Sequence, residues 1–365
     1  MRFGTEVVVT ISQATLYRMS EYAILVYPSA NRVYTDSTPA LLRAELAVFG
    51  LSALETEISE ISETELGGVG YLTFTTPAPL SERDLALLSN LSALYALFEL
   101  GDGVLKPVTI GPLANFDSDL LTIQKYPGKT NELFTKLLVN VTLLSTANPA
   151  AMLDKPLHLL DPLCGRGTTL NQAMMYGFDA TGLDVDGKDF DSYEMFIKTW
   201  LKQKRIKHLA ESGQVRRNKV RLGRRLDIGF GITKERYKAG DVRKLSYLNC
   251  DTLTTDELLR PNSVDLIVTD APYGVQHGSH RTQDATLARS PRDLLAAAVP
   301  VWTRVLRPGG ALGISWNTNV APREELAAIL EKAGLDVREE GPYAGFAHRV
   351  DQAIVRDLIV AAKPV

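Results

Sequence analysis

From about residue 130 onward, the chain alternates between short apolar runs and longer stretches with helical spacing. The apolar runs have the length and the Val, Ile and Leu content of buried parallel strands: residues 158–160, 180–183, 264–268 and 311–315. The other stretches have apolar residues three and four positions apart: residues 170–176, 193–201, 291–306 and 324–333. Strands that alternate with helices predict an α/β fold, with residues 346–362 closing the sheet.

The first third of the chain has a different pattern. It predicts strands at 22–27 and 70–75 and helices at 39–50 and 81–100. Ile58 and Ile61 are three residues apart, which does not fit the alternation of a strand, so their stretch stays unassigned. Because strands and helices are mixed and no catalytic cluster occurs, we predict a small α+β domain at 1–112. A second domain would then occupy residues 113–365.

A turn and a helix connect the two predicted domains. The turn is Tyr126-Pro127-Gly128, and the helix after it carries apolar residues on one face. Either Thr130 or Asn131 has a side chain suited to cap the start of this helix.

The apolar run at 264–268 leads into the sequence Thr-Asp-Ala-Pro-Tyr-Gly. An exocyclic amine on a nucleobase is a weak nucleophile, because its lone pair is delocalised into the ring. Asp270 and the backbone carbonyl of Ala271 can accept its two N–H hydrogen bonds and so orient the nitrogen toward an electrophile. Pro272 stiffens the turn, and Tyr273 offers a face on which a flipped base can stack. The alternative is an ordinary turn at a strand end, where Asp, Pro and Gly are common.

A glycine-rich loop follows the run at 158–160. Its sequence, residues 161–168, is Asp-Pro-Leu-Cys-Gly-Arg-Gly-Thr, and its glycines allow the backbone to approach a ligand closely. Asp184 ends the next predicted strand, where an acid can bind ribose hydroxyls in a Rossmann-type site. Gly177 and Gly182 are predicted to be structural.

These two segments resemble motifs I and IV of the amino-methyltransferases that use S-adenosylmethionine. The resemblance implies a Rossmann-like class I methyltransferase domain with a seven-stranded, mostly parallel sheet. It also implies S-adenosylmethionine as the cofactor, with Asp161 contacting the methionine ammonium. The cofactor-binding residues predicted in the first two strands and their loops are Asp161, Cys164, Gly165, Gly167, Thr168, Asp184 and Val185. The predicted catalytic residues are Asp270, Ala271, Pro272 and Tyr273.

A third acid is expected after the third strand, where it would meet the adenine amino group. Asp241, with Val242 beside it, would follow a short strand at 237–239, and Gly-Asp-Val-Arg resembles the family's sequence here. Asp251 would follow 246–250 instead. We favour Asp241 and Val242 and keep Asp251 as the alternative.

The resemblance extends to one family, the THUMP-associated tRNA guanosine-N2-methyltransferases. It rests on the order of elements in the N-terminal third, on the Arg-Pro-Gly-Gly turn at 307–310 and on the C-terminal sequence HRVDQAIVRDLIVAAK. It implies N2-methylation of guanosine in tRNA, with the N-terminal domain helping to hold the tRNA. This chain departs from the family at Ala271, where proline is usual. Because a backbone carbonyl accepts the hydrogen bond there, we expect activity to survive.

Basic residues gather in an insertion at 187–239, in a chain whose net charge is −3. Fourteen of them lie between 198 and 238, with few acids among them. This clustering is typical of a surface that contacts a nucleic-acid backbone. A solvated helix and loop is the alternative, because charge runs usually have that role.

Composition narrows the remaining choices. The chain has 45% hydrophobic residues, no apolar run long enough to span a bilayer and no recognisable signal sequence, so we predict a cytoplasmic protein without a membrane partner. Two cysteines imply neither a disulfide framework nor a Cys-rich zinc site. His277 and His280 follow the second motif, but without further ligands they do not predict a metal site.

Three other functions stay open. A DNA adenine-N6 methyltransferase would use the same Asp-x-Pro-Tyr sequence. A NAD-dependent oxidoreductase is disfavoured by the spacing of the glycines. A catalytically silent fold that binds RNA is disfavoured because Asp161, Asp184 and Asp270 are all present.

Overall fold

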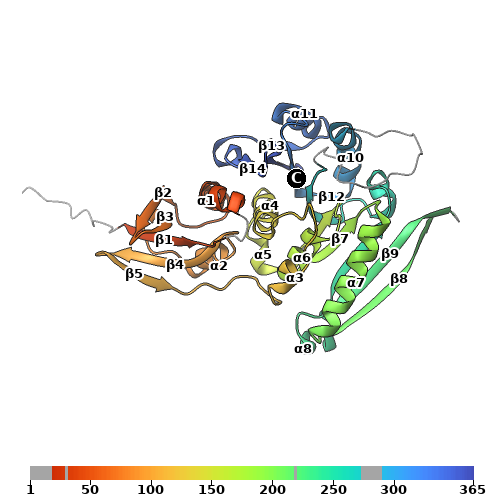
Figure 1. Ribbon diagram of the computed structural model, residues 1–365, viewed down its shortest axis with the longest axis horizontal. Helices are drawn as coiled ribbons and strands as arrows, with labels where there is room; N and C mark the ends of the chain where they lie inside the picture. The colour runs from red at the N-terminus through yellow and green to blue at the C-terminus, as the bar shows by residue number, and fades with distance from the viewer. Residues whose placement is uncertain (1–18, 29–31, 218–219, 273–289) are drawn as a thin grey trace, which may run out of the picture.

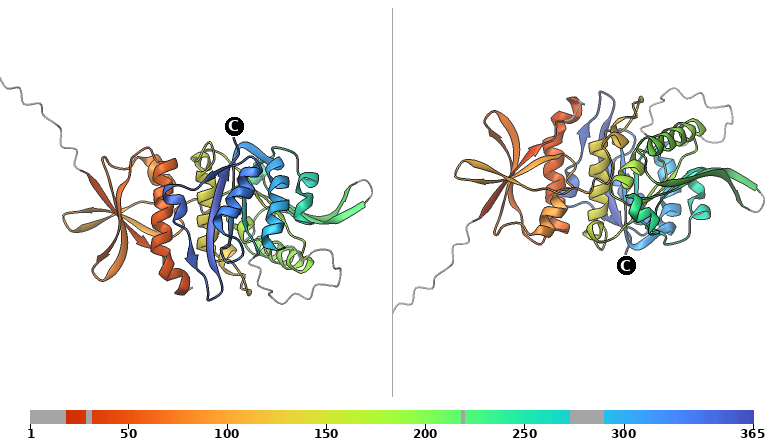
Figure 2. Two further views of the ribbon diagram at one scale, coloured as in Figure 1. Left: turned by 90° about the horizontal axis from the view of Figure 1, so that it is seen from above. Right: turned by 90° about the horizontal axis from the view of Figure 1, so that it is seen from below.

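The computed structural model describes residues 19–28, 32–217, 220–272 and 290–365. Two β-sheets lie side by side, and helices α1 (Arg32–Ser52) and α4 (Glu132–Leu144) pack against each other between them (Figures 1 and 2). No helix in the described part of the chain is long and apolar enough to cross a membrane.

The N-terminal sheet has five antiparallel strands in the order β2-β3-β1-β4-β5. The strands are β1 (Ser20–Val26), β2 (Ser59–Leu66), β3 (Val69–Thr76), β4 (Leu94–Gly101) and β5 (Val104–Val108). Helix α1 and the short helix α2 (Glu82–Leu88) lie on the face of this sheet that is turned toward α4 (Figure 2).

Two expectations for this region are corrected. The helix predicted at 81–100 ends at Leu88, and residues 94–101 form strand β4 because they pair with both β1 and β5. The unassigned stretch ends in strand β2, which begins at Ser59, directly after Ile58. Its register against β3 shifts between Ser59 and Ser62, which is a β-bulge with one extra residue. The extra residue explains why Ile58 and Ile61 are three positions apart.

The C-terminal sheet has ten strands, in the order β13-β15-β12-β11-β6-β7-β10-β9-β8, with β14 paired to β15. The five central strands are parallel neighbours: β12 (Leu306–Asn317), β11 (Val264–Asp270), β6 (His158–Asp161), β7 (Asp179–Leu183) and β10 (Arg243–Asn249). Antiparallel strands flank them: β13 (Asp336–Arg338), β14 (His348–Arg349) and β15 (Val355–Ala362) on one side, and β8 (His208–Arg217) and β9 (Val220–Phe230) on the other.

The prediction of a seven-stranded, mostly parallel sheet is therefore corrected. The sheet has ten strands, and its parallel pairs join only the five central ones in the described chain. The additional strands are the hairpin β8–β9 and the short β14. The hairpin arises from the basic insertion. Apolar residues at every second position of its second strand, Leu226, Ile228 and Phe230, are a strand signal that the charge of the insertion concealed. The α/β class and the central parallel strands are as predicted.

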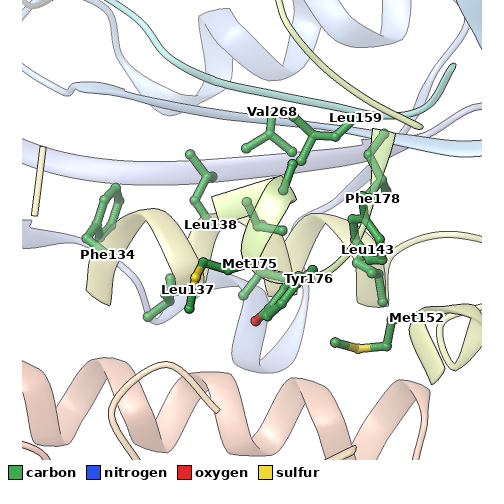
Figure 3. Close-up of a cluster of buried hydrophobic side chains, with 14 of the residues drawn as sticks. Phe134, Leu137, Leu138, Leu143, Met152, Leu159, Met175, Tyr176, Phe178 and Val268 are labelled. Carbon is green, nitrogen blue, oxygen red and sulfur yellow. The ribbon is translucent and has the colours of Figure 1, made fainter. Parts of the chain in front are cut away.

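Helices cover both faces of this sheet, and alternate residues of a strand point to opposite faces. Leu159 and Val268 lie in the core shared with α4 and α6 (Thr168–Met175), as Figure 3 shows. Leu160 and Ile267 lie in the second core, against α10 (Pro291–Val305) and α11 (Arg323–Lys332). Burial on both faces explains the continuous apolar runs in the sequence.

The remaining helices are short, apart from α7 (Gly187–Gln203), which follows β7. They are α3 (Asp119–Thr122), α5 (Ala151–Asp154), α8 (Lys234–Lys238), α9 (Thr255–Leu258) and the 3₁₀ helices η1 (Thr252–Thr254) and η2 (Gly341–Ala344).

The two sheets share one hydrophobic core through α1 and α4. At the centre of this contact the fully buried Glu45 of α1 accepts hydrogen bonds from Asn140 of α4, at 2.7 Å, and from the Ser92 hydroxyl, at 2.5 Å. Burial raises the pKa of the Glu45 carboxyl. The contact fixes the N-terminal sheet against the C-terminal half of the chain, and a domain boundary at 112/113 stays a prediction.

Candidate active site

The central parallel strands all end at the same edge of the sheet, which we call the carboxyl edge. Asp161 is the last residue of β6, Asp270 is the last residue of β11, and Asp184 directly follows β7. Because these strands are neighbours in the order β11-β6-β7, three acids that are far apart in the sequence are brought together. Open α/β sheets bind their ligands in this position.

Asp184 holds the glycine-rich loop in place. Its Oδ2 accepts a hydrogen bond from the Gly165 amide at 2.9 Å, and its Oδ1 accepts one from the Asp186 amide at 2.8 Å. Gly167 has a φ of 76°, and a Cβ built there would lie 2.3 Å from the ring of Tyr193 on α7. The loop therefore requires glycine at 167, both for its backbone conformation and for the packing of α7.

Asp161 is a buried acid with 3% of its surface exposed. It accepts hydrogen bonds from the Thr269 hydroxyl at 2.9 Å and from the Leu163 amide at 3.1 Å. Burial raises its pKa to about 7. No cationic side chain pairs with it among the residues that the structure describes, so a positively charged ligand group would be stabilised there.

The other loop residues have distinct surroundings. Cys164 is buried, its amide donates to the Leu183 carbonyl at 2.9 Å, and burial raises the pKa of its thiol, so it is not a nucleophile. A Cβ built at Gly182 would lie 2.6 Å from the Cys164 Sγ, which explains a structural glycine in β7. Val185 is an apolar side chain with 73% of its surface exposed at the carboxyl edge.

Tyr126 also belongs to this part of the site, although the sequence indicated only a turn there. Its hydroxyl lies 3.3 Å from the Thr168 hydroxyl, and its ring lies 4.7 Å from the guanidinium of Arg166. Arg166 in turn pairs with Asp189 of α7 at 2.8 Å. The connecting segment thus closes one side of the glycine-rich loop.

Asp270 is held by side chains from three other segments. Thr130 donates a hydrogen bond to Oδ2 at 2.6 Å, and Ser315 at the carboxyl end of β12 donates to Oδ1 at 2.8 Å. Arg356 on β15 lies 3.6 Å from Oδ2. The Ala271 amide donates to the Ser315 carbonyl at 2.8 Å, which continues the parallel pairing to the end of the strand.

These hydrogen bonds answer the question of which residue caps α4. Asn131 is the cap, because its side chain accepts hydrogen bonds from the amides of Leu133 and Phe134. Thr130 is thereby free of that role and bonds Asp270 instead. The sequence offered Thr130 only as a cap, and it offered no signal for Ser315 or Arg356, because the residues lie more than 40 positions from Asp270.

The remaining predicted residues of this segment are placed as follows. Ala271 is buried and Pro272 is exposed, beyond the end of β11. Tyr273, His277 and His280 lie outside the described residues.

The placement of Asp241 and Val242 is corrected. Residues 234–238 form helix α8, not a strand, and the third parallel strand β10 begins after Asp241, at Arg243. Asp241 therefore lies at the edge opposite the other acids, where it pairs with Arg236 at 2.8 Å and with Arg243. Strand β10 ends at Asn249, so the alternative, Asp251, is the acid at the carboxyl edge.

The end of β10 is tied to the end of β7. The Asn249 side chain donates to the Asp184 carbonyl at 2.9 Å, and the Asp251 carboxylate accepts from the Leu253 amide at 2.9 Å. If β10 supplies a contact to the adenine of the cofactor, that contact has to come from residues 249–251, at the carboxyl end of the strand.

A family model described as RMKL-like methyltransferase domain, UPF0020, matches residues 149–299. This match spans β6, the glycine-rich loop, Asp184 and Asp270. The chain carries an S-adenosylmethionine-dependent methyltransferase domain. The matched part leaves out the N-terminal sheet and the last strands of the C-terminal sheet.

Solved structures similar to the methyltransferase domain share little sequence with it. A TehB-like S-adenosylmethionine-dependent methyltransferase from Corynebacterium glutamicum is 13% identical, with a TM-score of 0.33, over 58% of this chain and 85% of that one. A 1,6-didemethyltoxoflavin-N1-methyltransferase from Burkholderia thailandensis is 16% identical, with a TM-score of 0.32, over 59% of this chain and 74% of that one. No curated protein is significantly similar in sequence.

The residues of the methyltransferase domain fit this cofactor. Asp161 is a buried acid without a cationic partner among the described residues, which suits the methionine ammonium. Asp184 lies at the end of β7, where ribose hydroxyls would be bound, and the exposed Val185 beside it offers an apolar surface for the adenine ring.

Proposed function

We propose that this protein transfers a methyl group from S-adenosylmethionine to the exocyclic amine of a nucleobase, and specifically to N2 of guanosine in tRNA. The observation that carries the proposal is the fixed carboxylate of Asp270 at the carboxyl end of β11. Two hydroxyls orient it, and it begins the sequence Asp-Ala-Pro-Tyr beside the cofactor loop.

An exocyclic amine is a weak nucleophile, because its lone pair is delocalised into the ring, and the proposed chemistry compensates for this weakness. When bound, the cofactor supplies a methyl group on a positively charged sulfur. The carboxylate of Asp270 accepts one N–H hydrogen bond, and the Ala271 carbonyl would accept the other. The nitrogen lone pair is then directed at the methyl carbon. During the methyl transfer Asp270 would stabilise the positive charge that develops on the acceptor nitrogen, and it would accept the proton that this nitrogen then loses.

Thr130 and Ser315 support this role of Asp270. Each donates to a different carboxylate oxygen, so the side chain cannot rotate away from the amine. The arrangement uses no covalent intermediate, which agrees with a Cys164 that is buried and protonated.

The choice of guanosine and of tRNA is supported by the sequence rather than by the geometry. It rests on the resemblance of the two motifs, the Arg-Pro-Gly-Gly turn and the C-terminal strand to the tRNA guanosine-N2-methyltransferases. The basic segment 198–238 and the N-terminal sheet are proposed to hold the RNA, in the cytoplasm. The fixed contact between the N-terminal sheet and α4 supports a shared role for the two halves.

The test is methyl transfer from labelled S-adenosylmethionine to tRNA, rRNA and genomic DNA from a strain that lacks the gene. The product should be digested to nucleosides, with Asp270→Ala as the control. We expect N2-methylguanosine in tRNA, which disappears in the variant. N6-methyladenine in DNA would keep the mechanism but replace the substrate. Cofactor binding without transfer to any of the three would favour a catalytically silent RNA-binding fold.

A further inference from the structure

Folding divides the basic insertion at 187–239 among three places. Its first part lies on α7, its middle part forms the hairpin β8–β9, and its last part is α8. Strand β9 pairs antiparallel with β10, so Phe230 lies opposite Arg243 at the start of β10, and Arg224 lies opposite Asn249 at its end. Helix α8 is therefore at the edge opposite the active site, and the described end of the hairpin ladder, Arg217 opposite Val220, is beyond the carboxyl edge.

The hairpin continues beyond the sheet. The β8–β9 ladder extends past Asn249 as far as the pair Arg217 and Val220, and Figure 1 shows this end projecting from the body of the molecule. We call residues 213–217 and 220–223 the arm. It extends past the carboxyl edge, the same edge at which β6, β7 and β11 end.

The root of the arm is fixed. A Cβ built at Gly223 would lie 2.0 Å from the Asn249 carbonyl, so the arm crosses the end of β10 in direct backbone contact. Val215 and Leu222 pack against the second core. Arg217 pairs with Glu257 of α9 at 2.7 Å. The arm is thus held in one position relative to the site.

The arginines of the hairpin fall into two groups. Arg217, Arg224 and Arg225 each have an acidic partner, at 2.7, 2.6 and 3.3 Å. Arg216 and Arg221 are exposed and have no acidic partner among the described residues. They lie directly opposite each other in the ladder, next to the bulge between Val215 and Arg216.

Two like charges directly opposite each other in a β-ladder destabilise the pairing. An anion that contacts both guanidinium groups would remove this repulsion, and planar guanidinium groups bind phosphate oxygens in pairs. We infer that the arm is a docking site for the phosphate backbone of the RNA substrate, through Arg216 and Arg221. This inference rests on the proposed function, because it assumes that the substrate is a nucleic acid.

Within the basic segment 198–238, the arm is thus the part that we expect to bind RNA. Lys234 and Lys238 on α8 are equally exposed and carry the same charge, but they lie at the opposite edge. They would contribute little to a complex formed at the carboxyl edge. Replacing Lys234 and Lys238 therefore removes the same charge as replacing Arg216 and Arg221, but at the opposite edge, and serves as a matched control.

The experiment compares Arg216→Gln/Arg221→Gln with Lys234→Gln/Lys238→Gln in the full chain. Binding of fluorescently labelled total tRNA is measured by anisotropy at several salt concentrations, with duplex DNA in parallel. We expect the arm variant to bind tRNA about tenfold more weakly. Its plot of log association constant against log salt concentration should be less steep, by about 1.5 in slope. The α8 variant should bind as the unchanged protein does. Melting temperature and cofactor affinity should be the same in all three proteins.

Each result has a defined meaning. Equal tRNA binding by the arm variant, equal losses in both variants, or tighter binding to duplex DNA than to tRNA would overturn the inference. None of these outcomes affects methyl transfer to a nucleobase, which the labelled assay measures separately. If the arm variant loses tRNA binding but the unchanged protein methylates no nucleobase, the docking site stands and the proposed function fails.

Discussion

The carboxyl edge has two halves that are built in different ways. The half that we propose to bind the cofactor, the cofactor half, comprises the loop 161–168 and Asp184, so it comes from one continuous stretch of about 25 residues. The half that we propose to bind the methyl acceptor, the acceptor half, comprises Asp270 with Thr130, Ser315 and Arg356, which come from four separate segments. A local unit can be recognised in a sequence, whereas a unit assembled by the fold cannot. The two halves should also fail separately when they are mutated.

The largest effect is expected for Asp270→Asn. The amide cannot accept the proton or provide a full negative charge, so methyl transfer should fall by about 100-fold or more. Cofactor affinity should stay unchanged, because Asp270 lies in the acceptor half. Single-turnover transfer and calorimetric cofactor binding measure the two effects. A parallel loss of cofactor affinity would show that the halves are not separate.

Asp161→Asn should lower the cofactor affinity and affect the transfer rate much less, which is the opposite of the result expected for Asp270→Asn. The variant keeps the shape of the side chain and removes the negative charge that would face the methionine ammonium. We expect cofactor affinity to fall by about 30-fold, equivalent to about 2 kcal/mol. The rate at saturating cofactor should change much less. Calorimetry and saturation kinetics on the same preparation would distinguish the two parameters, and an unchanged affinity would refute the assigned contact.

Thr130→Val and Ser315→Ala test the acceptor half through the residues that orient Asp270. Each removes one hydrogen bond to the carboxylate, so each should reduce the transfer rate by about tenfold and leave cofactor affinity unchanged. Thr122→Val is a matched control, because its hydroxyl donates to the backbone carbonyl of Ser118, the residue that precedes its own helix. Loss of activity in the control would point to a general effect of the substitution.

The pKa of Asp161 predicts a pH dependence for the cofactor half alone. Burial raises this pKa to about 7, so below that pH the carboxyl is increasingly protonated and must lose its proton to bind a cation. Cofactor affinity should therefore fall as the pH is lowered, approaching about tenfold per unit below pH 7. His348 does not titrate in this range, because burial lowers its pKa to about 4. Calorimetry from pH 5.5 to 8.5 would check the profile, and Asp161→Asn should flatten it.

The smallest expected effect concerns the third acid. Asp251→Ala should weaken cofactor binding by about fivefold, equivalent to about 1 kcal/mol, if the segment after β10 contacts the adenine. Asp241→Ala should not change it, because Asp241 lies at the opposite edge between Arg236 and Arg243. Both variants can be compared by calorimetry at one pH. The reverse order of effects would restore the original assignment.

The error over Asp241 shows where reasoning from the sequence failed. The sequence Gly-Asp-Val-Arg precedes β10 rather than following it, because the basic insertion folds as a helix, a hairpin and a second helix. Antiparallel pairing of β9 with β10 sets this arrangement. The alternation of Leu226, Ile228 and Phe230 indicates a strand, but nothing local to it indicates antiparallel pairing with β10.

Other features were predictable because they depend on local chemistry. The runs that form β6, β7 and β11 are mostly apolar because both faces of these strands are buried. The helix predicted at 81–100 failed for the opposite reason. Its second half has helix-forming residues but pairs with strands β1 and β5 on either side, so tertiary contacts override propensity.

The most direct test of the account is the identity of the atom that receives the methyl group. Once nucleoside mapping has located the modified guanosine, a tRNA carrying inosine at that position should be prepared. Inosine differs from guanosine only by the missing exocyclic amine. The account predicts full methyl transfer to the guanosine tRNA and none to the inosine tRNA, with both binding equally well. Equal transfer to both would show that the acceptor is not the exocyclic amine and would contradict the role assigned to Asp270.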